Sequence, residues 1–179
     1  MFSYVGLIMV LISWVAGGFL VRRWRGTNAM SISQHAASAQ GAQWLFAGTL
    51  IIGGSVFYYW LLGWFTPRLH LTTLFVVLLS ITIFAQVITA IIPDTDKWKR
   101  MVHRVAAYGM AVLYFPLAIL ILLNTASVSA KVAESISLLY MVIAFVLFVF
   151  LAKAKERYLI FQSLYVIAFQ VIILAAAYL

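Results

Sequence analysis

Six long apolar stretches fill most of this 179-residue chain. A helix that crosses the hydrocarbon core of a bilayer needs about 20 consecutive, mostly apolar residues, and each stretch meets this length. A transmembrane β-barrel would instead show segments of about 10 residues with alternating hydrophobicity. We therefore predict an all-α, polytopic integral membrane protein whose single domain (residues 1–179) folds as six transmembrane helices in an up-and-down bundle. The predicted spans cover about residues 2–21, 43–65, 70–92, 102–124, 132–152 and 158–179.

The basic residues are concentrated in three short segments between these spans. Charged residues make up only 9% of the chain, against about 25% in soluble domains, which is too few to cover a water-facing surface. Short loops rich in Lys and Arg stay on the cytoplasmic side of a membrane. We therefore expect a multi-pass protein of the cell membrane with these basic loops in the cytoplasm and both chain ends outside. The clusters are Arg22, Arg23 and Arg25; Lys97, Lys99, Arg100 and Arg104; and Lys153, Lys155 and Arg157, which leaves only Arg68 and Lys131 elsewhere.

The net charge of +8 indicates a membrane rather than a nucleic acid as the partner. Basic side chains that border apolar spans contact anionic lipid headgroups, whereas a nucleic-acid binder needs a basic patch on a folded polar surface. We expect membrane lipids as partners and no nucleic acid, with a second copy of the chain or another membrane protein as a further candidate. The first apolar stretch lacks a basic leading segment and is too long for a signal-peptide core, which predicts a retained span.

Prolines predict where some of the helices end or bend. Pro67 and Pro93 follow apolar runs and cannot continue a helix. Pro116 lies inside the fourth span, where it should kink the helix and free a carbonyl near Val112. Asp94 and Asp96 precede this span and are candidate caps for its first turn.

The loop after the first span contains a helix-capping signal. Ser31 is a residue type that accepts a hydrogen bond from the free N–H groups of a helix N-terminus. It predicts a short interfacial helix through Ala39 that Gly41 ends, with a disordered loop as the alternative.

Small residues and tryptophans predict how the spans contact each other and the membrane. Small residues let helix backbones approach closely inside a bilayer, and tryptophans collect at the two membrane interfaces. The residues expected at helix contacts are Ala16, Gly17, Gly18, Gly48, Gly53, Gly54, Ala106 and Gly109. The tryptophans expected mostly in the interfacial belt are Trp14, Trp44, Trp60, Trp64 and Trp98.

Polar residues from separate segments reach one level near the cytoplasmic interface in this topology. Titratable side chains at a membrane edge can transfer protons or bind a polar group. The candidate catalytic residues are His103, Asp94, His35 and Ser33. The candidate ligand-binding residues are Gln86, His103, Tyr108 and Gln162. Near the opposite interface, Glu134 and Lys131 are expected to be solvated.

We expect neither a metal nor a cofactor. The chain contains no cysteine, and His35 and His103 come from separate loops without the close spacing of a metal motif. No motif for ATP, dinucleotides, Ser-His-Asp hydrolysis or zinc hydrolysis is present. No internal repeat supports an inverted-repeat transporter.

Three functions remain open on this basis. The first, which we favour, is a non-enzymatic membrane protein that binds lipid or a hydrophobic ligand near Gln86, His103 and Gln162, or that serves as a partner subunit. The second is an intramembrane lipid-modifying enzyme that uses the candidate catalytic residues at the cytoplasmic interface. The third is a small transporter, which would need a polar path across the bundle.

Two motifs resemble those of a known family. They are Ser31-Ile32-Ser33-Gln34-His35-Ala36, and Ile92-Pro93-Asp94-Thr95-Asp96 followed by His103-Arg104-Val105-Ala106-Ala107. The motifs and the six spans resemble the bacterial and archaeal membrane family called domain of unknown function 998 and, more distantly, the Frag1/DRAM/Sfk1 group. The resemblance implies six spans and matches the family pattern at Ile32, Ser33, Pro93, Asp94 and His103. It implies no activity, and Gln34 and His35 stand where an acidic residue often follows in the family.

Overall fold

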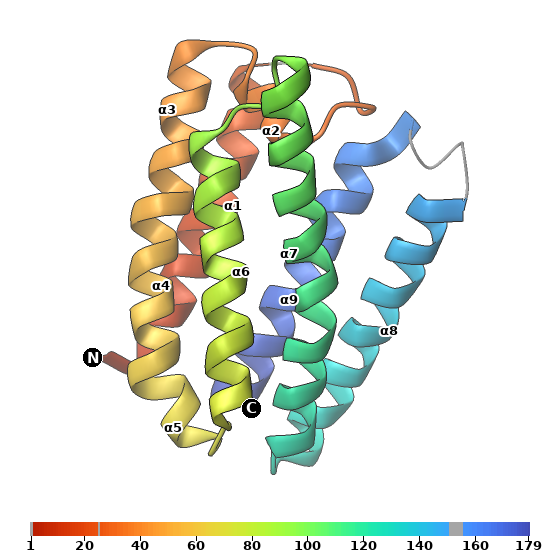
Figure 1. The fold of residues 1–179 in the computed structure, drawn as a ribbon. Helices are drawn as coiled ribbons and strands as arrows, with labels where there is room; N and C mark the ends of the chain where they lie inside the picture. Colours follow the sequence, from red (N-terminus) through yellow and green to blue (C-terminus); the bar gives the residue numbers. More distant parts are fainter. Residues whose placement is uncertain (1, 25, 151–155) are drawn as a thin grey trace.

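The computed structural model describes residues 2–24, 26–150 and 156–179. These residues form helices and loops without any strand. Six helical rods are long and apolar enough to cross a membrane (Figure 1). They are Phe2–Arg23, Gln40–Arg68, Thr73–Ile91, Lys97–Asn124, Val128–Phe150 and Tyr158–Tyr178. The prediction of an all-α polytopic protein with six spanning helices is confirmed. Arg25, Lys153, Lys155 and the predicted end of the fifth span at residue 152 lie outside the described residues.

Two of the rods are composed of several helical segments. The first rod begins with a 3₁₀ turn (Phe2–Tyr4) and continues as α1 (Val5–Arg23). The second joins α3 (Gln40–Gly48), α4 (Gly54–Trp60) and α5 (Thr66–Arg68) through two π-helical turns at Thr49–Gly53 and Leu61–Phe65. The other four rods are single helices, namely α6 (Thr73–Ile91), α7 (Lys97–Asn124), α8 (Val128–Phe150) and α9 (Tyr158–Tyr178). The short helix α2 (Ile32–Ala36) lies between the first two rods.

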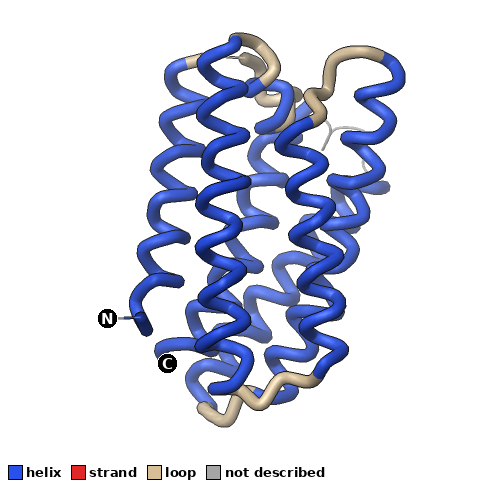
Figure 2. The backbone as a smooth tube through the Cα atoms, turned by 60° about the vertical axis from the view of Figure 1, so that its left-hand side comes forward, coloured by secondary structure: helices blue, strands red, loops and turns tan. Residues whose placement is uncertain are grey.

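Consecutive rods run antiparallel, and both chain ends lie at the same end of the bundle (Figures 1 and 2). The hydroxyl of Tyr178 donates to the carbonyl of Ser3, so the two ends touch. The other end carries α2 together with Arg22, Arg23, Lys97, Lys99 and Arg100, and we call it the basic end. Close antiparallel pairs form between α6 and α7 and between α8 and α9, while α7 also lies against α9 and α1 packs on the second rod.

Large buried apolar side chains gather in the half of the bundle away from the basic end. Trp60 and Phe65 of the second rod, Phe75 of α6 and Leu117 of α7 are all buried there. The Trp60 ring stacks on Trp64 with 5.3 Å between ring centroids. Trp60 is 0% exposed, so the prediction that it belongs to an interfacial belt is wrong. Its indole fills the space left by Gly6 of α1, where a Cβ would lie 2.5 Å from a ring atom.

Most of the glycines predicted at helix contacts face open space. A Cβ built on any of them would have no atom within 4 Å in the described structure. Within the described residues, these positions therefore make no close contact with another helix. Gly54 is the exception, because it lies against the amide of Gln86. The residues that face open space are Gly17, Gly18, Gly48, Gly53 and Gly109.

The proline predictions have mixed outcomes. Pro93 follows the end of α6 at Ile91, as predicted. The second rod, in contrast, continues through Pro67 to Arg68. Pro67 lies in the first turn of α5, just after the π-helical turn at Leu61–Phe65. The wider hydrogen-bond spacing of that turn lets the rod continue without the N–H that proline lacks.

The fourth span continues through Pro116 as one helix, α7. Proline removes the N–H that would bond the carbonyl of Val112. The hydroxyl of Tyr165 on α9 donates to the neighbouring carbonyl of Ala111. The stretch that Pro116 loosens therefore has a hydrogen-bond donor from another helix.

Candidate functional site

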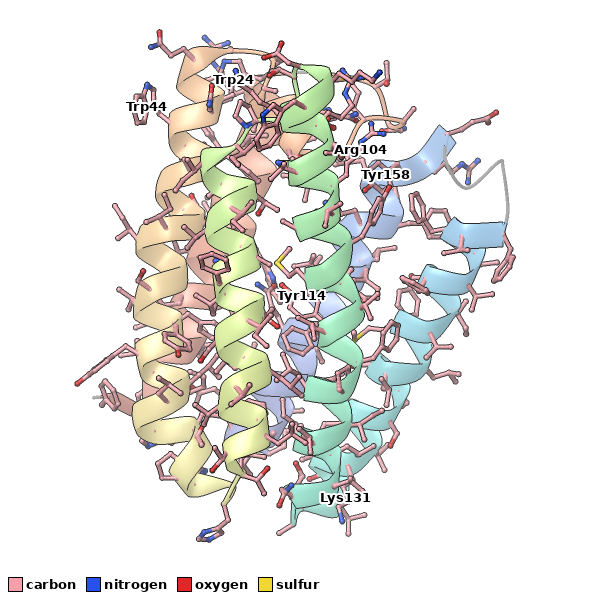
Figure 3. The ribbon with its side chains drawn as sticks, viewed as in Figure 1. Trp24, Trp44, Arg104, Tyr114, Lys131 and Tyr158 are labelled. Atoms are coloured by element: carbon pink, nitrogen blue, oxygen red, sulfur yellow. The ribbon has the colours of Figure 1, made fainter. Side chains whose placement is uncertain are left out.

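A polar cavity of about 280 Å³ opens at the basic end of the bundle. The loop before α2, α2 itself, the segment before α7, and the facing surfaces of α7 and α9 form its walls, with one residue from α8. Figure 3 places Arg104 and Tyr158, two of the lining residues, at this end, whereas Lys131 lies at the other. The polar and charged lining residues are Ser31, Ser33, Gln34, Asp94, His103, Arg104, Tyr108, Tyr158 and Gln162.

Hydrogen bonds at its N-terminus hold α2 at the cavity. The hydroxyl of Ser31 accepts from the N–H of Gln34 at 3.1 Å, and the Gln34 side chain accepts from the N–H of Ser31 at 2.8 Å. This reciprocal capping box confirms Ser31 as a helix cap. The Oε1 atom of Gln162 on α9 accepts from the N–H of Ile32 at 2.9 Å, which ties α2 to the bundle. The helix ends at Ala36 rather than at the predicted Ala39.

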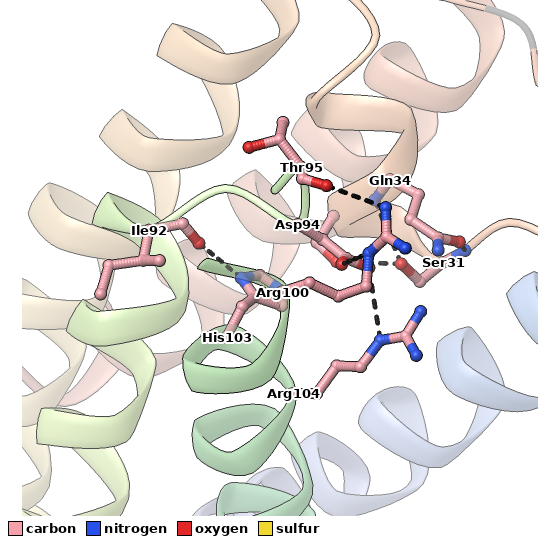
Figure 4. A network of polar contacts seen from close by, with 9 residues as sticks. Ser31, Gln34, Ile92, Asp94, Thr95, Arg100, His103 and Arg104 are labelled. Carbon is pink, nitrogen blue, oxygen red and sulfur yellow. Dashed lines mark hydrogen bonds and ion pairs between the residues drawn. The ribbon is translucent and has the colours of Figure 1, made fainter. Parts of the chain in front are cut away.

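His103 is held by a backbone carbonyl. Its Nδ1 atom lies 2.6 Å from the carbonyl oxygen of Ile92, the residue that follows α6 (Figure 4). A carbonyl can only accept, so Nδ1 must carry the proton and donate it. The side chain is 3% exposed and lines the cavity.

Asp94 is the centre of an ion-pair network (Figure 4). Its side chain is only 4% exposed, and Oδ1 accepts from Nε of Arg100 at 3.1 Å. Arg100 also donates to the carbonyl of Thr95 at 2.8 Å. The Oδ2 atom of Asp94 lies 3.7 Å from Nε of Arg104. Two guanidinium groups therefore share one carboxylate, which leaves one surplus positive charge beside the cavity.

The prediction that Asp94 or Asp96 caps α7 through its side chain is wrong. Asp96 occupies the N-cap position without a side-chain hydrogen bond to the helix. Its carboxylate instead pairs with Nζ of Lys99 at 2.9 Å, one turn further on. Three basic side chains of α7, those of Lys99, Arg100 and Arg104, pair with the two carboxylates, which therefore do not bond the free N–H groups of the helix.

An apolar slot of about 90 Å³ continues from the polar cavity into the bundle. It lies between α7, α8 and α9, and five residues line both hollows: Ala107, Tyr108, Phe148, Tyr158 and Gln162. The slot extends along α7 from Ala107 to Tyr114, a distance of about 10 Å at 1.5 Å per residue. The remaining lining residues are Met110, Ala111, Ala144, Phe145, Phe161, Tyr165 and Val166.

The structure brings together three of the four candidate catalytic residues at the cavity wall, namely Ser33, Asp94 and His103. His35 lies outside this lining and is 1% exposed, with Nδ1 2.9 Å from the carbonyl of Ser31. The Ser33 hydroxyl lies 2.9 Å from that of Ser31. Within the described part of the chain, neither histidine is hydrogen-bonded to Ser33 or Asp94, and no group of three His, Asp or Glu side chains could hold a metal.

The candidate ligand-binding residues divide in the same way. His103, Tyr108 and Gln162 line the polar cavity. Gln86 lies elsewhere, because its amide donates to the carbonyl of Leu50 at 2.8 Å, within a π-helical turn of the second rod. Gln86 therefore satisfies a backbone group of a neighbouring rod instead of facing the cavity.

Sequence analysis missed Arg104 and Tyr158 as cavity residues. A periodicity signal for both was present, because Arg104 and Tyr108 are four residues apart, as are Tyr158 and Gln162. Side chains at this spacing share one face of a helix. The candidates Tyr108 and Gln162 could therefore have identified their neighbours one turn away.

The environment of Glu134, at the opposite end of the bundle, differs from the prediction. Its side chain is 0% exposed, so the expectation that it is solvated is wrong. Its Oε1 atom accepts from the hydroxyl of Thr125 at 2.8 Å, while Oε2 has no partner among the described residues. Lys131, one turn away, is exposed as expected.

Comparison of the chain with protein-family models, curated proteins and solved structures finds no match. The resemblance to the domain of unknown function 998 family therefore stays a prediction.

Proposed function

We propose that this multi-pass protein of the cell membrane binds a lipid or a similar amphiphile at its basic end. The polar part of the ligand occupies the polar cavity, and its hydrocarbon part enters the apolar slot between α7, α8 and α9. The observation that carries this proposal is the continuity of the two hollows, which share five lining residues.

The chemistry of the two hollows supports an amphiphile rather than a wholly polar or wholly apolar ligand. Hydrocarbon gains free energy in an apolar slot at about 25 cal/mol per Å² removed from water. A polar group inside a membrane protein needs hydrogen-bond partners, because an unsatisfied one costs several kcal/mol. Phe145 and Phe161 line the apolar slot. Ser31, Tyr108 and Gln162 supply hydrogen-bonding groups to the polar cavity.

The charge distribution supports a cytoplasmic position for the basic end. Ten of the 12 Lys and Arg residues belong to the three basic segments, and the positive-inside rule assigns such segments to the cytoplasm. The polar cavity would then open at the level of the inner-leaflet headgroups, where a lipid can enter with its chain directed into the bundle.

The alternative functions receive less support from the described residues. An enzyme of the predicted type needs a nucleophile and a base within about 3 Å of each other, but among the described residues neither histidine is hydrogen-bonded to Ser33 or Asp94. A transporter needs a polar path to the opposite end. Trp60, Leu117 and Ile121 fill that half of the bundle and are each at most 1% exposed.

Photo-crosslinking tests the proposal. The purified protein is reconstituted in vesicles of phosphatidylethanolamine and phosphatidylglycerol that carry a trace of a phospholipid with a diazirine in its acyl chain. We expect crosslinked peptides to be concentrated at the slot, around Ala107, Phe145 and Phe161. Ala107→Trp fills the point where the two hollows meet and should abolish these crosslinks.

Val105→Trp is the matched control, because this α7 residue is 70% exposed on the lipid-facing surface. It should leave the crosslinks in the slot unchanged. Crosslinks spread evenly around the outer surface, with no difference between the two variants, would contradict the proposed binding site.

A further inference from the structure

The charge balance of the polar cavity indicates the class of headgroup that it takes. We propose that the cavity binds a net-anionic phosphate headgroup, with the guanidinium of Arg104 as its cationic ligand. This inference rests on the proposed function and adds the chemical identity of the polar part.

Arg100, not Arg104, is the principal partner of Asp94. The Arg100 pair has the shorter distance, 3.1 Å against 3.7 Å, and a second Arg100 nitrogen is fixed by the carbonyl of Thr95. Among the described residues, the two terminal nitrogens of Arg104 make no hydrogen bond, and Figure 4 shows them on the side away from Asp94. A planar guanidinium presents two parallel donors that match two phosphate oxygens.

Hydrogen-bond donors on the facing surfaces of α7 and α9 surround the same space. Tyr108 lies one turn after Arg104 on α7, and Tyr158 and Gln162 lie one turn apart on α9. The Oε1 atom of Gln162 is already engaged by the N–H of Ile32, which leaves its NH₂ group as the part available to a ligand. One cation, two phenolic hydroxyls and an amide NH₂ are well suited to an oxyanion.

A cationic headgroup fits the cavity less well. Among the described residues, Asp94 supplies the only carboxylate in the lining, and each of its oxygens faces an arginine. An aromatic cage for a quaternary ammonium needs several ring faces directed at the cation. The rings of Phe148 and Tyr158 instead stack on each other, with 4.6 Å between centroids.

The size of the hollows limits how much of the ligand they enclose. Small-molecule pockets range over about 300–1,000 Å³, and the cavity of 280 Å³ and slot of 90 Å³ together lie near the lower limit. This room suits a phosphate headgroup with part of one chain, so the rest of the lipid would remain outside the two hollows, in the bilayer.

Binding of four probes to delipidated protein in detergent tests this proposal. The probes are phosphatidic acid, diacylglycerol and phosphatidylcholine with identical chains, and glycerol 3-phosphate without chains. We expect phosphatidic acid to bind at least about tenfold tighter than diacylglycerol or phosphatidylcholine, since hydrogen bonds to charged groups are among the stronger ones. Glycerol 3-phosphate should bind far more weakly because nothing fills the slot.

Two charge-removing substitutions on the same helix distinguish binding at a specific site from general electrostatic attraction of an anionic lipid to the basic end. Arg104→Gln should weaken phosphatidic acid binding about tenfold or more and leave diacylglycerol binding unchanged. Lys97→Gln removes an exposed cation at the same end, outside the cavity lining, and should leave both unchanged. Arg104→Lys keeps the positive charge but loses the two parallel donors of the guanidinium, so it should weaken phosphatidic acid binding by an intermediate amount. This variant replaces Arg104→Gln in the test if Arg104→Gln does not fold.

The possible outcomes distinguish this inference from the function on which it rests. Equal binding of phosphatidic acid, phosphatidylcholine and diacylglycerol would overturn the anionic headgroup but leave amphiphile binding intact. An equal loss in Arg104→Gln and Lys97→Gln would overturn the specific role of Arg104. Tight binding of glycerol 3-phosphate alone would support a phosphate site but contradict a lipid ligand, and binding of no probe would contradict both proposals.

Discussion

Gly6 and Trp60 pack so closely that no further carbon atom fits between them. The Trp60 ring is 0% exposed and is stacked against Phe57 and Trp64, with centroids 5.6 and 5.3 Å away. A Cβ at position 6 would lie 2.5 Å from a ring carbon. The ring cannot move aside without displacing its neighbours, because a packed interior has few voids.

Gly6→Ala should therefore destabilise the folded protein. Overpacking of a tight core costs about 1–3 kcal/mol, although alanine by itself favours helix over glycine. Thermal unfolding in detergent, followed by tryptophan fluorescence, would show a lower midpoint for this variant. Gly18→Ala on the same helix has nothing within 4 Å of the new Cβ and should be at least as stable as the wild type. Equal midpoints for both variants would refute the close contact.

The role of Gly6 could not be predicted from the sequence, whereas its position inside a span could. Spanning helices are apolar on all sides, so no polar stripe indicates which side faces the protein. The sequence therefore does not indicate whether Gly17 or Gly18 faces another helix. The close approach at Gly6 depends on a tryptophan from another rod.

Glu134 shows how an error in a helix boundary changes the environment predicted for a residue. The fifth span was predicted to begin at residue 132, but α8 begins at Val128. Glu134 then lies six residues, or about 9 Å, inside the helix instead of at its edge. Hydropathy locates the centre of a span well, but Ser and Ala at its start can belong to the helix or to the loop.

The short helix α2 depends on its cap and on its attachment to α9. A helix of five residues is not stable by itself in water, so the capping box at Ser31 and the bond from Ile32 to Gln162 must hold it in place. Because Ser31 and Ser33 also line the polar cavity, the order of α2 and the shape of the cavity are coupled.

Ser31→Ala should loosen α2 without unfolding the bundle. Loss of a serine cap costs about 1 kcal/mol of helix stability, and the N–H of Gln34 loses its acceptor. Hydrogen exchange followed by mass spectrometry should show faster exchange in peptides covering residues 31–37 and unchanged exchange in α7 and α9. Ser38→Ala removes a hydroxyl that bonds the carbonyl of His35 and caps no N–H, so exchange at Gln34 should stay slow in that control. Slow exchange in both variants would mean that the tertiary attachment alone holds α2.

The number of spans follows directly from the sequence, but the ends of the helices do not. The cost of exposing backbone polar groups to lipid requires a helix wherever about 20 apolar residues follow one another. Where each helix ends depends on local features of the backbone and side chains. A π-helical turn carries the second rod through Pro67, and α7 begins at Lys97 because its basic side chains can reach the headgroup region while the backbone is already helical.

The two halves of the bundle differ in packing. The half with the chain ends is filled by large apolar side chains such as Trp60, Phe65 and Leu117, whereas both hollows lie toward the basic end. The topology was sufficient to predict that Ser33, Asp94, His103, Tyr108 and Gln162 reach a common level. It could not predict that Gln86 and His35 turn away, since the rotation of each helix about its axis is set by packing.

The proposed cytoplasmic position of the basic end makes a prediction for the whole molecule, and the absence of cysteine makes it simple to test. Single cysteines can be introduced at neutral, exposed positions, so that the charges that determine orientation stay unchanged. Thr27 lies in the loop at the basic end, and Ala126 lies in the loop at the opposite end. A membrane-impermeant maleimide should label Ala126→Cys in intact cells and Thr27→Cys only after permeabilisation. The reverse pattern would place the polar cavity in the outer leaflet and contradict an inner-leaflet ligand. Labelling of both in intact cells would mean that the chain inserts in two orientations.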